Sequence, residues 1–426
     1  MKRQHVHYLL LGGGVSAGEA AVAIRKFDRK NAAMIVTSES IRPYRRSELS
    51  RGYLRRELGR EAVMTLEPDW FANEGVTLRT GRRATQIDVD RHLVSLDNDE
   101  QILFDRLLIA TGAVAKHLTI PGANLPGVHY LRTLDDADRL LNTIESAKLQ
   151  GHFHDLVDER AGRRLRGRAV VIGANMLGVE VASSLRQVGI HVELIARNAN
   201  VWHRFAGESV GRLVGRTLSD AGIAVHENEI ATRIEGDGRV QRVVLSSGKV
   251  VEADFIVACV GTDQNRDLLR GTPVAAERTI LVDAQCHTSA SNVWAAGDCC
   301  TVFDPHFGKH TPISRWEHAV FTGQIAGTNM AGGSATYDKI PANVTRWLGR
   351  TATGFGESRF VDHRIVRQVD SDRLIEFGVA RDGRLAQILI IGDVDSMLPN
   401  AQQLVEKRVN VAGREDVLRD PNGSIE

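Results

Sequence analysis

Two stretches of the chain repeat one order of hydrophobic and polar positions, and this order predicts how the chain folds. In the first stretch, the apolar run 5–11 leads into the glycine-rich turn Gly12–Gly18, a helical segment over 19–26 and a second apolar run over 32–36. Short apolar runs separated by a helix are typical of parallel strands joined by a crossover. This pattern predicts the opening of an α/β sheet.

The same order returns later in the chain. Residues 169–172 are apolar, 173–178 form a turn, 179–188 are helical in pattern, and 191–195 form another apolar run. A repeated unit of this kind indicates that the chain contains two nucleotide-binding domains.

The pattern changes past about residue 336. Two apolar runs, 374–380 and 385–391, are joined by the turn sequence 381–384, which predicts a β-hairpin. A helix is expected over 399–408, with a proline in its first turn. This region predicts a third domain of the α+β class.

Composition narrows the class of protein. The chain has 426 residues, of which 42% are hydrophobic and 25% are charged, and its 54 basic and 53 acidic side chains nearly cancel. A net charge of +1 disfavours binding to nucleic acid or to a membrane surface through overall charge. The four cysteines are too few to staple a chain of this size, which favours a reducing compartment.

The amino terminus does not match a secretory signal. Lys2 and Arg3 precede an apolar run of only four residues, Tyr8–Leu11, whereas a signal needs roughly 7–15. Elsewhere no run approaches the ~20 apolar residues of a membrane helix. We therefore expect a cytoplasmic protein with no membrane or nucleic-acid partner.

The first turn has the spacing of a dinucleotide-binding loop, Gly12-x-Gly14-x-x-Ala17. The first glycine makes the tight turn, the second lets a pyrophosphate approach the backbone, and the third small residue lets helix and strand pack closely. The phosphate then lies at the helix N-terminus, where N–H groups and the dipole favour an anion. Glu39, just past the second strand, can accept the ribose hydroxyls. The alternative is a structural glycine-rich turn.

The second turn is less regular. Gly173 and Gly178 occupy the outer positions, but Asn175 takes the middle one, so its side chain has to point away from a phosphate. Ala196 and Arg197 stand where a carboxylate would favour a free 2′-hydroxyl; an arginine favours a 2′-phosphate. We expect NADPH to be used at least as well as NADH. A degenerate turn that binds nothing is the alternative.

Three further segments complete a recognisable set: Ala110-Thr111-Gly112, Trp294–Asp298, and the basic segment Arg42–Arg51, which reads RPYRRSELSR. With both turns, the chain resembles the two-dinucleotide flavoprotein oxidoreductases of the glutathione-reductase superfamily. Within them it is most similar to the branch of ferredoxin and rubredoxin reductases and apoptosis-inducing-factor-like proteins. The resemblance covers residues 6 to about 400.

The resemblance implies an α/β fold with two Rossmann-like dinucleotide-binding domains, one for FAD and one for NAD(P)H, plus the C-terminal α+β domain. The FAD-binding domain is expected to be discontinuous, over 1–124 and 264–335. The NAD(P)H-binding domain is expected over 125–263 and the C-terminal domain over 336–426. Residues 151–168, which are polar and carry five arginines, are expected to form a surface connection.

The same resemblance assigns the cofactor-binding residues. Those assigned to FAD are Gly12, Gly13, Gly14, Val15, Ser16, Ala17, Glu39, Arg46, Arg51, Ala84, Ala110, Thr111, Gly112, Arg132, Gly297, Asp298 and Trp316. Those assigned to NAD(P)H are Gly173, Asn175, Met176, Leu177, Gly178, Glu180, Arg197 and Gly261.

Three residues are expected to be catalytic. The family pairs a lysine beside the flavin with the glutamate that follows the second turn, and here the pair would be Arg51 and Glu180. An arginine can hold a carboxylate with two hydrogen bonds but cannot give up its proton. Trp316 is expected to stack on the nicotinamide. The alternatives are a solvated basic face for Arg51, since seven arginines lie within 42–60, and core packing for Trp316.

Cysteine positions and departures from the family limit the chemistry. No cysteine occurs in residues 1–258, so a thiol relay from the first FAD segment is excluded, and Cys299-Cys300 is interpreted as packing. The branch's paired prolines are replaced by Ser47 and Glu48. Its aromatic-Ser-Asp segment, which often covers the flavin, corresponds to residues 344–346, with a tryptophan one residue on.

No metal site is predicted. His152, His154 and Asp155 lie on the polar insertion, and His306 and His310 lie in a loop. Without a cysteine among them, both groups are interpreted as solvated loops.

The expected function is electron transfer. NAD(P)H reduces FAD by hydride transfer, and the flavin passes single electrons to a ferredoxin- or rubredoxin-type protein, because nicotinamide gives two electrons and iron–sulfur proteins accept one. The basic residues within 42–60 would steer a small acidic iron–sulfur carrier. The alternative is an apoptosis-inducing-factor-like protein that responds to NAD(P)H by conformational change or assembly, with slow turnover.

Overall fold

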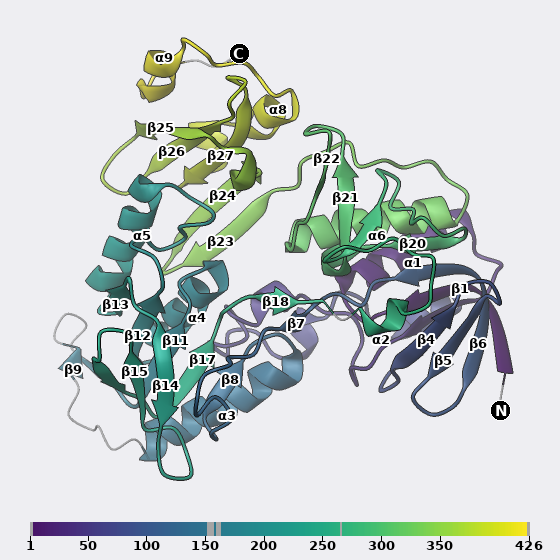
Figure 1. The fold of residues 1–426 in the computed structure, drawn as a ribbon, viewed down its shortest axis with the longest axis horizontal. Helices are drawn as coiled ribbons and strands as arrows, with labels where there is room; N and C mark the ends of the chain where they lie inside the picture. Colours follow the sequence, from purple (N-terminus) through teal and green to yellow (C-terminus); the bar gives the residue numbers. More distant parts are fainter. Residues whose placement is uncertain (1–2, 151–156, 159–162, 265, 424–426) are drawn as a thin grey trace. The chain divides into compact units, whose positions relative to one another are not determined.

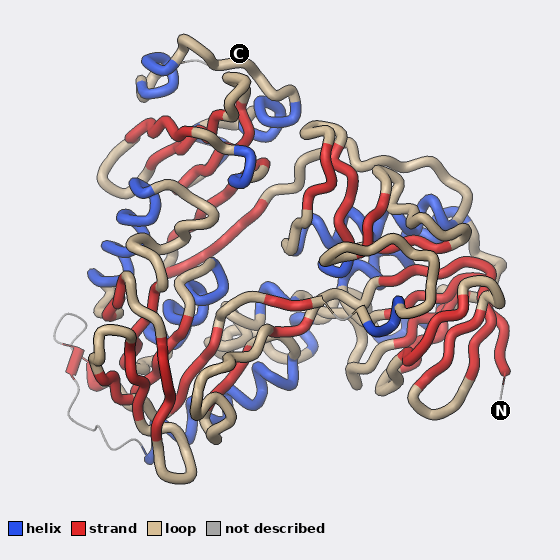
Figure 2. Tube along the Cα trace, in the orientation of Figure 1, coloured by secondary structure: helices blue, strands red, loops and turns tan. Residues whose placement is uncertain are grey.

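The computed structural model describes residues 3–150, 157–158, 163–264 and 266–423 (Figures 1 and 2). The chain forms two compact units, each assembled from three segments. The first unit comprises 1–45, 60–114 and 262–341, and the second comprises 46–59, 115–261 and 342–426. Residues 46–59 fall inside the range 1–124 predicted for the FAD domain, yet they pack with the second unit. The three predicted domains and their boundaries stay a prediction.

A mixed sheet forms the centre of the first unit. Its strand order is β3-β2-β1-β6-β5-β4. Strand β20 also pairs with β6, in parallel, along residues 107–109. The bounds are β1 Arg3–Leu11, β2 Ala33–Val36, β3 Val76–Arg79, β4 Ala84–Asp88, β5 Leu93–Leu96, β6 Gln101–Ile109 and β20 Val293–Ala295. Leu9 pairs in parallel register with Met34 and Leu107. All three side chains are fully buried, as expected for central parallel strands covered on both faces.

Two helices pack side by side in this unit, α1 (Val15–Phe27) and α6 (Trp316–Met330). The contact is close because α6 presents Gly323 and Gly327 to α1. A β-carbon on Gly327 would overlap the backbone of Ala20. The start of α1, which carries the first glycine turn, is thereby fixed against α6.

Smaller elements complete the first unit. A three-stranded sheet has the order β19-β21-β22. The bounds are η2 Glu61–Val63, α2 Pro68–Asn73, η3 Asp267–Leu269, β19 Ile280–Val282, η4 Gly297–Cys299, β21 Cys300–Asp304 and β22 Lys309–Thr311. The short strands β7 (Val114–Ala115) and β18 (Thr262–Asp263) lie on the chain segments that leave and re-enter this unit.

A parallel five-stranded sheet of order β13-β12-β11-β17-β8 forms the nucleotide-binding part of the second unit. The bounds are β8 Val128–Tyr130, α3 Leu134–Gln150, β11 Arg168–Ile172, α4 Met176–Gln187, β12 His191–Ala196, α5 Glu208–Asp220, β13 Ala224–Glu227 and β17 Phe255–Ala258. An antiparallel sheet has the order β14-β15-β16, with β14 Ala231–Glu235, β15 Arg242–Leu245 and β16 Val250–Glu252. Both predicted strand–turn–helix–strand units are therefore confirmed.

The C-terminal part is an antiparallel sheet of order β23-β24-β27-β26-β25. The bounds are β23 Asn343–Trp347, β24 Arg350–Gly356, η5 Ser358–Phe360, β25 His363–Gln368, β26 Leu374–Val379, β27 Leu385–Ile391, α7 Val394–Met397, α8 Ala401–Glu406 and α9 Glu415–Arg419. The predicted hairpin is β26–β27, and Gly383 in its turn has a φ of +76°. Pro399 lies before α8 instead of in its first turn, because Asn400 is the N-cap.

Three short elements remain: η1 (Arg46–Glu48) and the paired strands β9 (Val157–Asp158) and β10 (Arg163–Arg164). Both strands belong to the predicted connection 151–168, most of which lies outside the described residues. In the part of the chain that the structure describes, none of the helices has the length and apolar character needed to span a membrane.

Candidate functional site

The first glycine turn has room for a ligand on one side and none on the other. Gly12 has a φ of +126°, and a β-carbon there would overlap the carbonyl oxygen of Ala110. A β-carbon on Gly13 would overlap the side chain of Thr37. A β-carbon on Gly14 would meet nothing within 4 Å. The turn is therefore closed against the sheet at Gly12 and open at Gly14.

Helix α1 begins in this open space. Gly14 is its N-cap and makes no side-chain hydrogen bond to the first turn of the helix. The first N–H groups of a helix lack intrahelical partners, and together with the dipole they favour a bound anion. The residues Gly12 to Ala17 therefore fit the pyrophosphate of a dinucleotide.

Glu39 is held in place by a residue that the sequence analysis did not single out. The hydroxyl of Tyr44 donates to Oε2 of Glu39 over 2.7 Å, and Tyr44 is buried. The N–H of Gly81 donates to the carbonyl of Glu39 over 3.0 Å. Ala84, the first residue of β4, follows three residues after Gly81. Tyr44 lies in the segment Arg42–Arg51, on which part of the family resemblance rests, so its place in that segment could have marked it as a site residue.

The turn around Asp298 packs onto the start of α1. Gly297 has a φ of +79°, and a β-carbon there would overlap the hydroxyl of Ser16. That hydroxyl donates to the carbonyl of Ala319 in α6 over 2.9 Å. The N–H of Gly297 donates to Thr322 Oγ1 over 3.0 Å. Asp298 itself is half-buried.

The first unit therefore brings together the residues predicted from its separate motifs. Ala110, which continues into Thr111 and Gly112, lies against Gly12, and Gly297 lies against Ser16. Trp316 is the first residue of α6 and is half-buried. Its expected stacking on the nicotinamide stays a prediction.

In the second unit, Arg46 and Arg132 lie together. Nη1 of Arg46 donates to the carbonyl of Arg132 over 2.8 Å. The N–H of Arg132 donates in turn to Asp136 in α3 over 3.1 Å. Their assignment to FAD stays a prediction.

Arg51 and Glu180 form the predicted pair, but not in the geometry expected. Nε of Arg51 lies 3.9 Å from Oε1 of Glu180, and the same Nε donates to the carbonyl of Ser47 over 2.6 Å. Two direct hydrogen bonds between guanidinium and carboxylate, as the sequence allowed, are not formed. They are absent because the Nε–H of Arg51 donates to the backbone carbonyl of Ser47, four residues earlier in the chain.

Other groups supply the hydrogen bonds to Glu180. The hydroxyl of Ser50 donates to Oε2 over 2.6 Å, and the N–H of Arg346 in β23 donates to Oε1 over 3.2 Å. Glu180 is 8% exposed. Burial raises its pKa, although Arg51 and both hydrogen bonds oppose the increase. Neither Ser50 nor Arg346 was predicted, since their proximity to Glu180 depends on long-range packing.

The side chain of Asn175 closes the second glycine turn with two hydrogen bonds. The side-chain oxygen of Asn175 accepts from the N–H of Gly178 over 3.0 Å, and its amide donates to the carbonyl of Cys259 over 2.7 Å. Asn175 is thus the N-cap of α4, with a φ of −83° that any residue adopts. A β-carbon on Gly173 would overlap the Cys259 carbonyl oxygen, so the tight turn itself is present.

The other predicted coenzyme residues lie around this turn. Arg197 follows β12 and is exposed. Gly261, with a φ of +111°, is exposed and has open space around it. Met176 accepts a hydrogen bond at its sulfur from the amide of Asn343 in β23, at 3.1 Å. Leu177 is half-buried.

Carboxylates pair with four of the seven arginines within 42–60, which are Arg42, Arg51, Arg55 and Arg56. The sequence showed only Glu48 and Glu57 inside the segment. These two pair with Arg51 and Arg55. The structure adds partners from outside the segment, which are Glu61 for Arg42, Glu180 for Arg51 and Glu145 for Arg56. A count of the charges within residues 42–60 does not include these partners, because they lie outside the segment.

The four cysteines are buried thiols, Cys259, Cys286, Cys299 and Cys300. Burial raises the pKa of Cys259 to about 12 and also raises that of the Cys299 thiol. A thiol that stays protonated is a poor nucleophile, which agrees with a packing role.

Among the described residues, no group of three or more His, Cys, Asp or Glu side chains is arranged to hold a metal ion. His152, His154 and Asp155 lie outside those residues.

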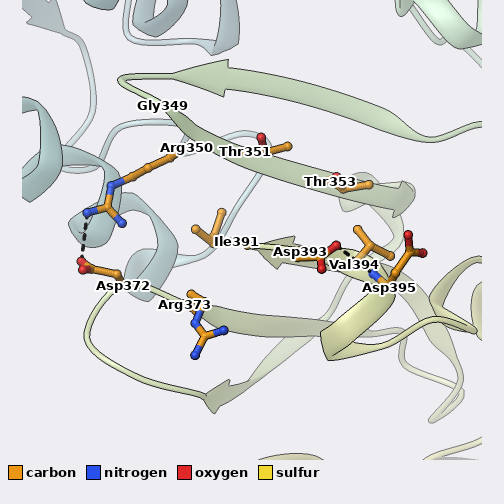
Figure 3. A pocket seen from close by; sticks show the side chains of 11 residues that line it. Gly349, Arg350, Thr351, Thr353, Asp372, Arg373, Ile391, Asp393, Val394 and Asp395 are labelled. Carbon is orange, nitrogen blue, oxygen red and sulfur yellow. Dashed lines mark hydrogen bonds and ion pairs between the residues drawn. The ribbon is translucent and has the colours of Figure 1, made fainter.

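A cavity of about 560 Å³ lies at one end of the C-terminal sheet (Figure 3). Three of its charged side chains are in ion pairs: Arg350 lies 3.1 Å from Asp372, and Arg373 donates to Asp370 over 2.6 Å. No residue assigned to FAD or NAD(P)H lines it. The cavity is separate from the predicted site.

Trp347, next to the segment thought to cover the flavin, is a core residue of the second unit. It is 2% exposed, and its indole N–H donates to Thr217 in α5 over 2.9 Å. Its ring packs edge-on against Trp202, with centroids 5.1 Å apart.

A family described as pyridine nucleotide-disulphide oxidoreductase matches residues 6–323. The chain belongs to this family. The resemblance drawn from the motifs is confirmed, and with it an oxidoreductase of two Rossmann-like domains. FAD and NAD(H) are the cofactors of this family and its ferredoxin reductase homologues. The family's disulphide chemistry has no counterpart here before Cys259, because no cysteine precedes it.

Relatives and solved structures agree with this assignment. The rubredoxin-NAD(+) reductase of Pseudomonas putida is 28% identical over 84% of this chain and 88% of its own. The ferredoxin–NAD(+) reductase component of the biphenyl dioxygenase system of Paraburkholderia xenovorans (strain LB400) is 27% identical over 84% and 83%. A crystal structure of the covalent putidaredoxin reductase–putidaredoxin complex matches with a TM-score of 0.87 and 22% identity, over 97% of this chain and 96% of that one. The last likeness concerns the fold.

Proposed function

We propose that this protein oxidises NADH or NADPH and passes the electrons through FAD to a ferredoxin- or rubredoxin-type protein. The observation that carries the proposal is the absence of any cysteine in residues 1–258, combined with the family's two dinucleotide sites. Without a thiol relay, electrons leave directly from the flavin. The relatives named rubredoxin and ferredoxin reductases support an iron–sulfur or rubredoxin acceptor.

The residues of this chain have distinct parts in the proposed reaction. The turn from Gly12 and the start of α1 hold the FAD pyrophosphate, and Tyr44 orients Glu39 toward the adenosine ribose. FAD held by these residues would supply the chemistry that converts a two-electron hydride donor into a source of single electrons. Trp316 supplies a planar face for the nicotinamide. Glu180, held by Ser50 and by the backbone N–H of Arg346, provides a buried carboxyl next to the second turn.

We further propose the predicted division into domains, with FAD bound by 1–124 and 264–335 and the coenzyme bound by 125–263. A cytoplasmic location is proposed because the four cysteines are free thiols, which suits a reducing compartment.

Anaerobic stopped-flow absorbance tests this function. Mixing the purified protein with NADH or NADPH is expected to bleach the flavin band within a turnover. A second mix with oxidised ferredoxin or rubredoxin is expected to restore it. If neither coenzyme bleaches the flavin, the proposed function is wrong.

A second function is favoured by one observation. Because carboxylates neutralise most of the arginines of 42–60, less positive charge is left to attract an acidic carrier. A protein that holds reduced flavin as a signal, as in the apoptosis-inducing-factor-like branch, needs no such attraction. In that case the flavin is bleached by the coenzyme but stays bleached after the second mix.

A further inference from the structure

Arg51 is shared by two carboxylates. Its Nη2 lies 3.7 Å from Oε1 of Glu48, and its Nε lies 3.9 Å from Oε1 of Glu180. Both distances are longer than a hydrogen bond. The Nε–H of Arg51 donates instead to the carbonyl of Ser47 over 2.6 Å. Glu48 stands where the related branch has a proline, so the second carboxylate is a feature of this chain.

The charges around Glu180 do not balance. Glu48, Arg51 and Arg55 face it from segment 46–59, the Cys259 thiol faces it from the end of β17, and β23 contributes the backbone N–H of Arg346. Arg55 is held by Glu57 through two hydrogen bonds of 2.7 and 2.6 Å. One guanidinium, Arg51, is thus left to serve two carboxylates. With both ionised, the three groups carry one net negative charge in a buried place, which is costly.

Ser50 suits either charge state of Glu180. Its hydroxyl lies 2.6 Å from Oε2, and a hydroxyl can donate to a carboxylate or accept from a carboxylic acid. The Ser50 carbonyl is itself fixed by the hydroxyl of Ser184, which donates to it over 2.6 Å. A proton on Oε2 is therefore accommodated without rearrangement.

We propose that Glu48 is a positioning residue which, by sharing Arg51 with Glu180, keeps a proton on Glu180 at neutral pH. Burial and the negative charge of Glu48 both act in this direction on the pKa of Glu180. The inference rests on the proposed function insofar as Glu180 faces the nicotinamide. A protonated carboxyl can donate one hydrogen bond to the carboxamide oxygen of the coenzyme, whereas an ionised carboxyl can only accept.

Infrared spectroscopy of the purified holoprotein across pH reads the charge of Glu180 directly. We expect a carboxylic-acid carbonyl band at pH 7 that is absent in Glu180→Gln, which assigns it. In Glu48→Gln, the midpoint at which this band disappears is expected about one pH unit lower, since a like charge is removed and Arg51 is released to Glu180. Glu48→Asp retains the charge and is expected to restore most of the wild-type midpoint.

Glu145→Gln is the matched control, because Glu145 pairs with Arg56 of the same segment, and the exposed Arg56 is not among the groups that face Glu180. Its midpoint is expected to equal that of the wild type. The pH profile of flavin reduction is expected to move with the band in each variant. Absence of the band at pH 7, or equal midpoints in Glu48→Gln and Glu145→Gln, overturns the inference. Failure of both coenzymes to reduce the flavin overturns the proposed function instead and leaves the infrared readout intact.

Discussion

The N–H of Gly178 donates to the side-chain oxygen of Asn175 over 3.0 Å, so the helix that follows the second glycine turn is capped by its own chain. A pyrophosphate bound at the same helix start competes with this bond for the same donor. The two glycine turns of the protein therefore differ in how ready they are for a phosphate, since the first has Gly14 at the equivalent place and no such cap.

Asn175→Gly is expected to lower the KM for the coenzyme several-fold, because Gly178 N–H is released and space is opened. Stability is expected to fall by about 1–3 kcal/mol, the scale of the two side-chain hydrogen bonds that are lost, to Gly178 and to Cys259. Asn175→Asp is the control, since it keeps the cap but adds a negative charge, and its KM is expected to rise. Steady-state kinetics with urea unfolding measures both quantities; an unchanged KM in Asn175→Gly contradicts the competition.

Gly14→Ala is expected to weaken FAD binding at least tenfold while the apoprotein stays within about 1 kcal/mol of wild-type stability. A β-carbon there meets only open space, which the pyrophosphate is expected to occupy. In Gly12→Ala, the β-carbon overlaps Ala110 at a φ of +126°, so that variant is expected to lose about 2 kcal/mol or more before any ligand is considered. Flavin titration and thermal unfolding separate the two. Equal FAD affinity in Gly14→Ala and wild type would show that the turn does not hold the cofactor.

His318 is expected to make the first unit acid-sensitive. Burial, and to a lesser extent the charge of Arg315, lowers its pKa from 6.5 to about 3. Between these values the unfolded chain binds one more proton than the folded chain, so stability is complete above pH 6.5 and falls by about 1.4 kcal/mol per pH unit as pH drops toward 3.

His318→Gln is expected to show a shallower loss of stability with falling pH, because its amide does not titrate. Urea unfolding between pH 6.5 and 4.5, followed by release of flavin fluorescence, measures the difference in slope. Parallel curves for wild type and variant would mean that His318 is not kept neutral by the fold.

Arg197→Ala tests the coenzyme preference. Arg197 is exposed at the end of β12, and a charge-assisted contact with a 2′-phosphate contributes roughly 1.5–3 kcal/mol. The variant is expected to lose at least tenfold in affinity for NADPH and little for NADH. A wild-type preference for NADH above tenfold that is unchanged in Arg197→Ala would show that the arginine does not touch the nucleotide.

The sequence predicts this protein well where the determinants are local. The strand, glycine turn and helix around Gly12 follow from neighbouring residues, because a short apolar run and a positive φ leave few alternatives. Glu180 was identified through the resemblance to a known family, and its ion pair with Arg51 is present in the structure.

The sequence predicts less where contacts join distant segments. Ser50 and Arg346 hold Glu180 from positions 130 and 166 residues away, and no periodicity reports such contacts. The hydrogen bond from Tyr44 to Glu39 joins residues only five positions apart, but it lies in an irregular segment where no periodicity predicts which side chains meet. The neutralisation of the basic segment was missed for the same reason, since Glu145 and Glu180 lie far from it in sequence.

Reduction of an iron–sulfur protein or rubredoxin by the purified flavoprotein tests the central claim most directly. The rate of acceptor reduction is measured under anaerobic conditions with NADH and NADPH in turn, in wild type and in Glu180→Gln. We predict sustained turnover of a ferredoxin or rubredoxin, with a strongly reduced rate in the variant. Full bleaching of the flavin by coenzyme with no electron transfer to any such acceptor would contradict the account.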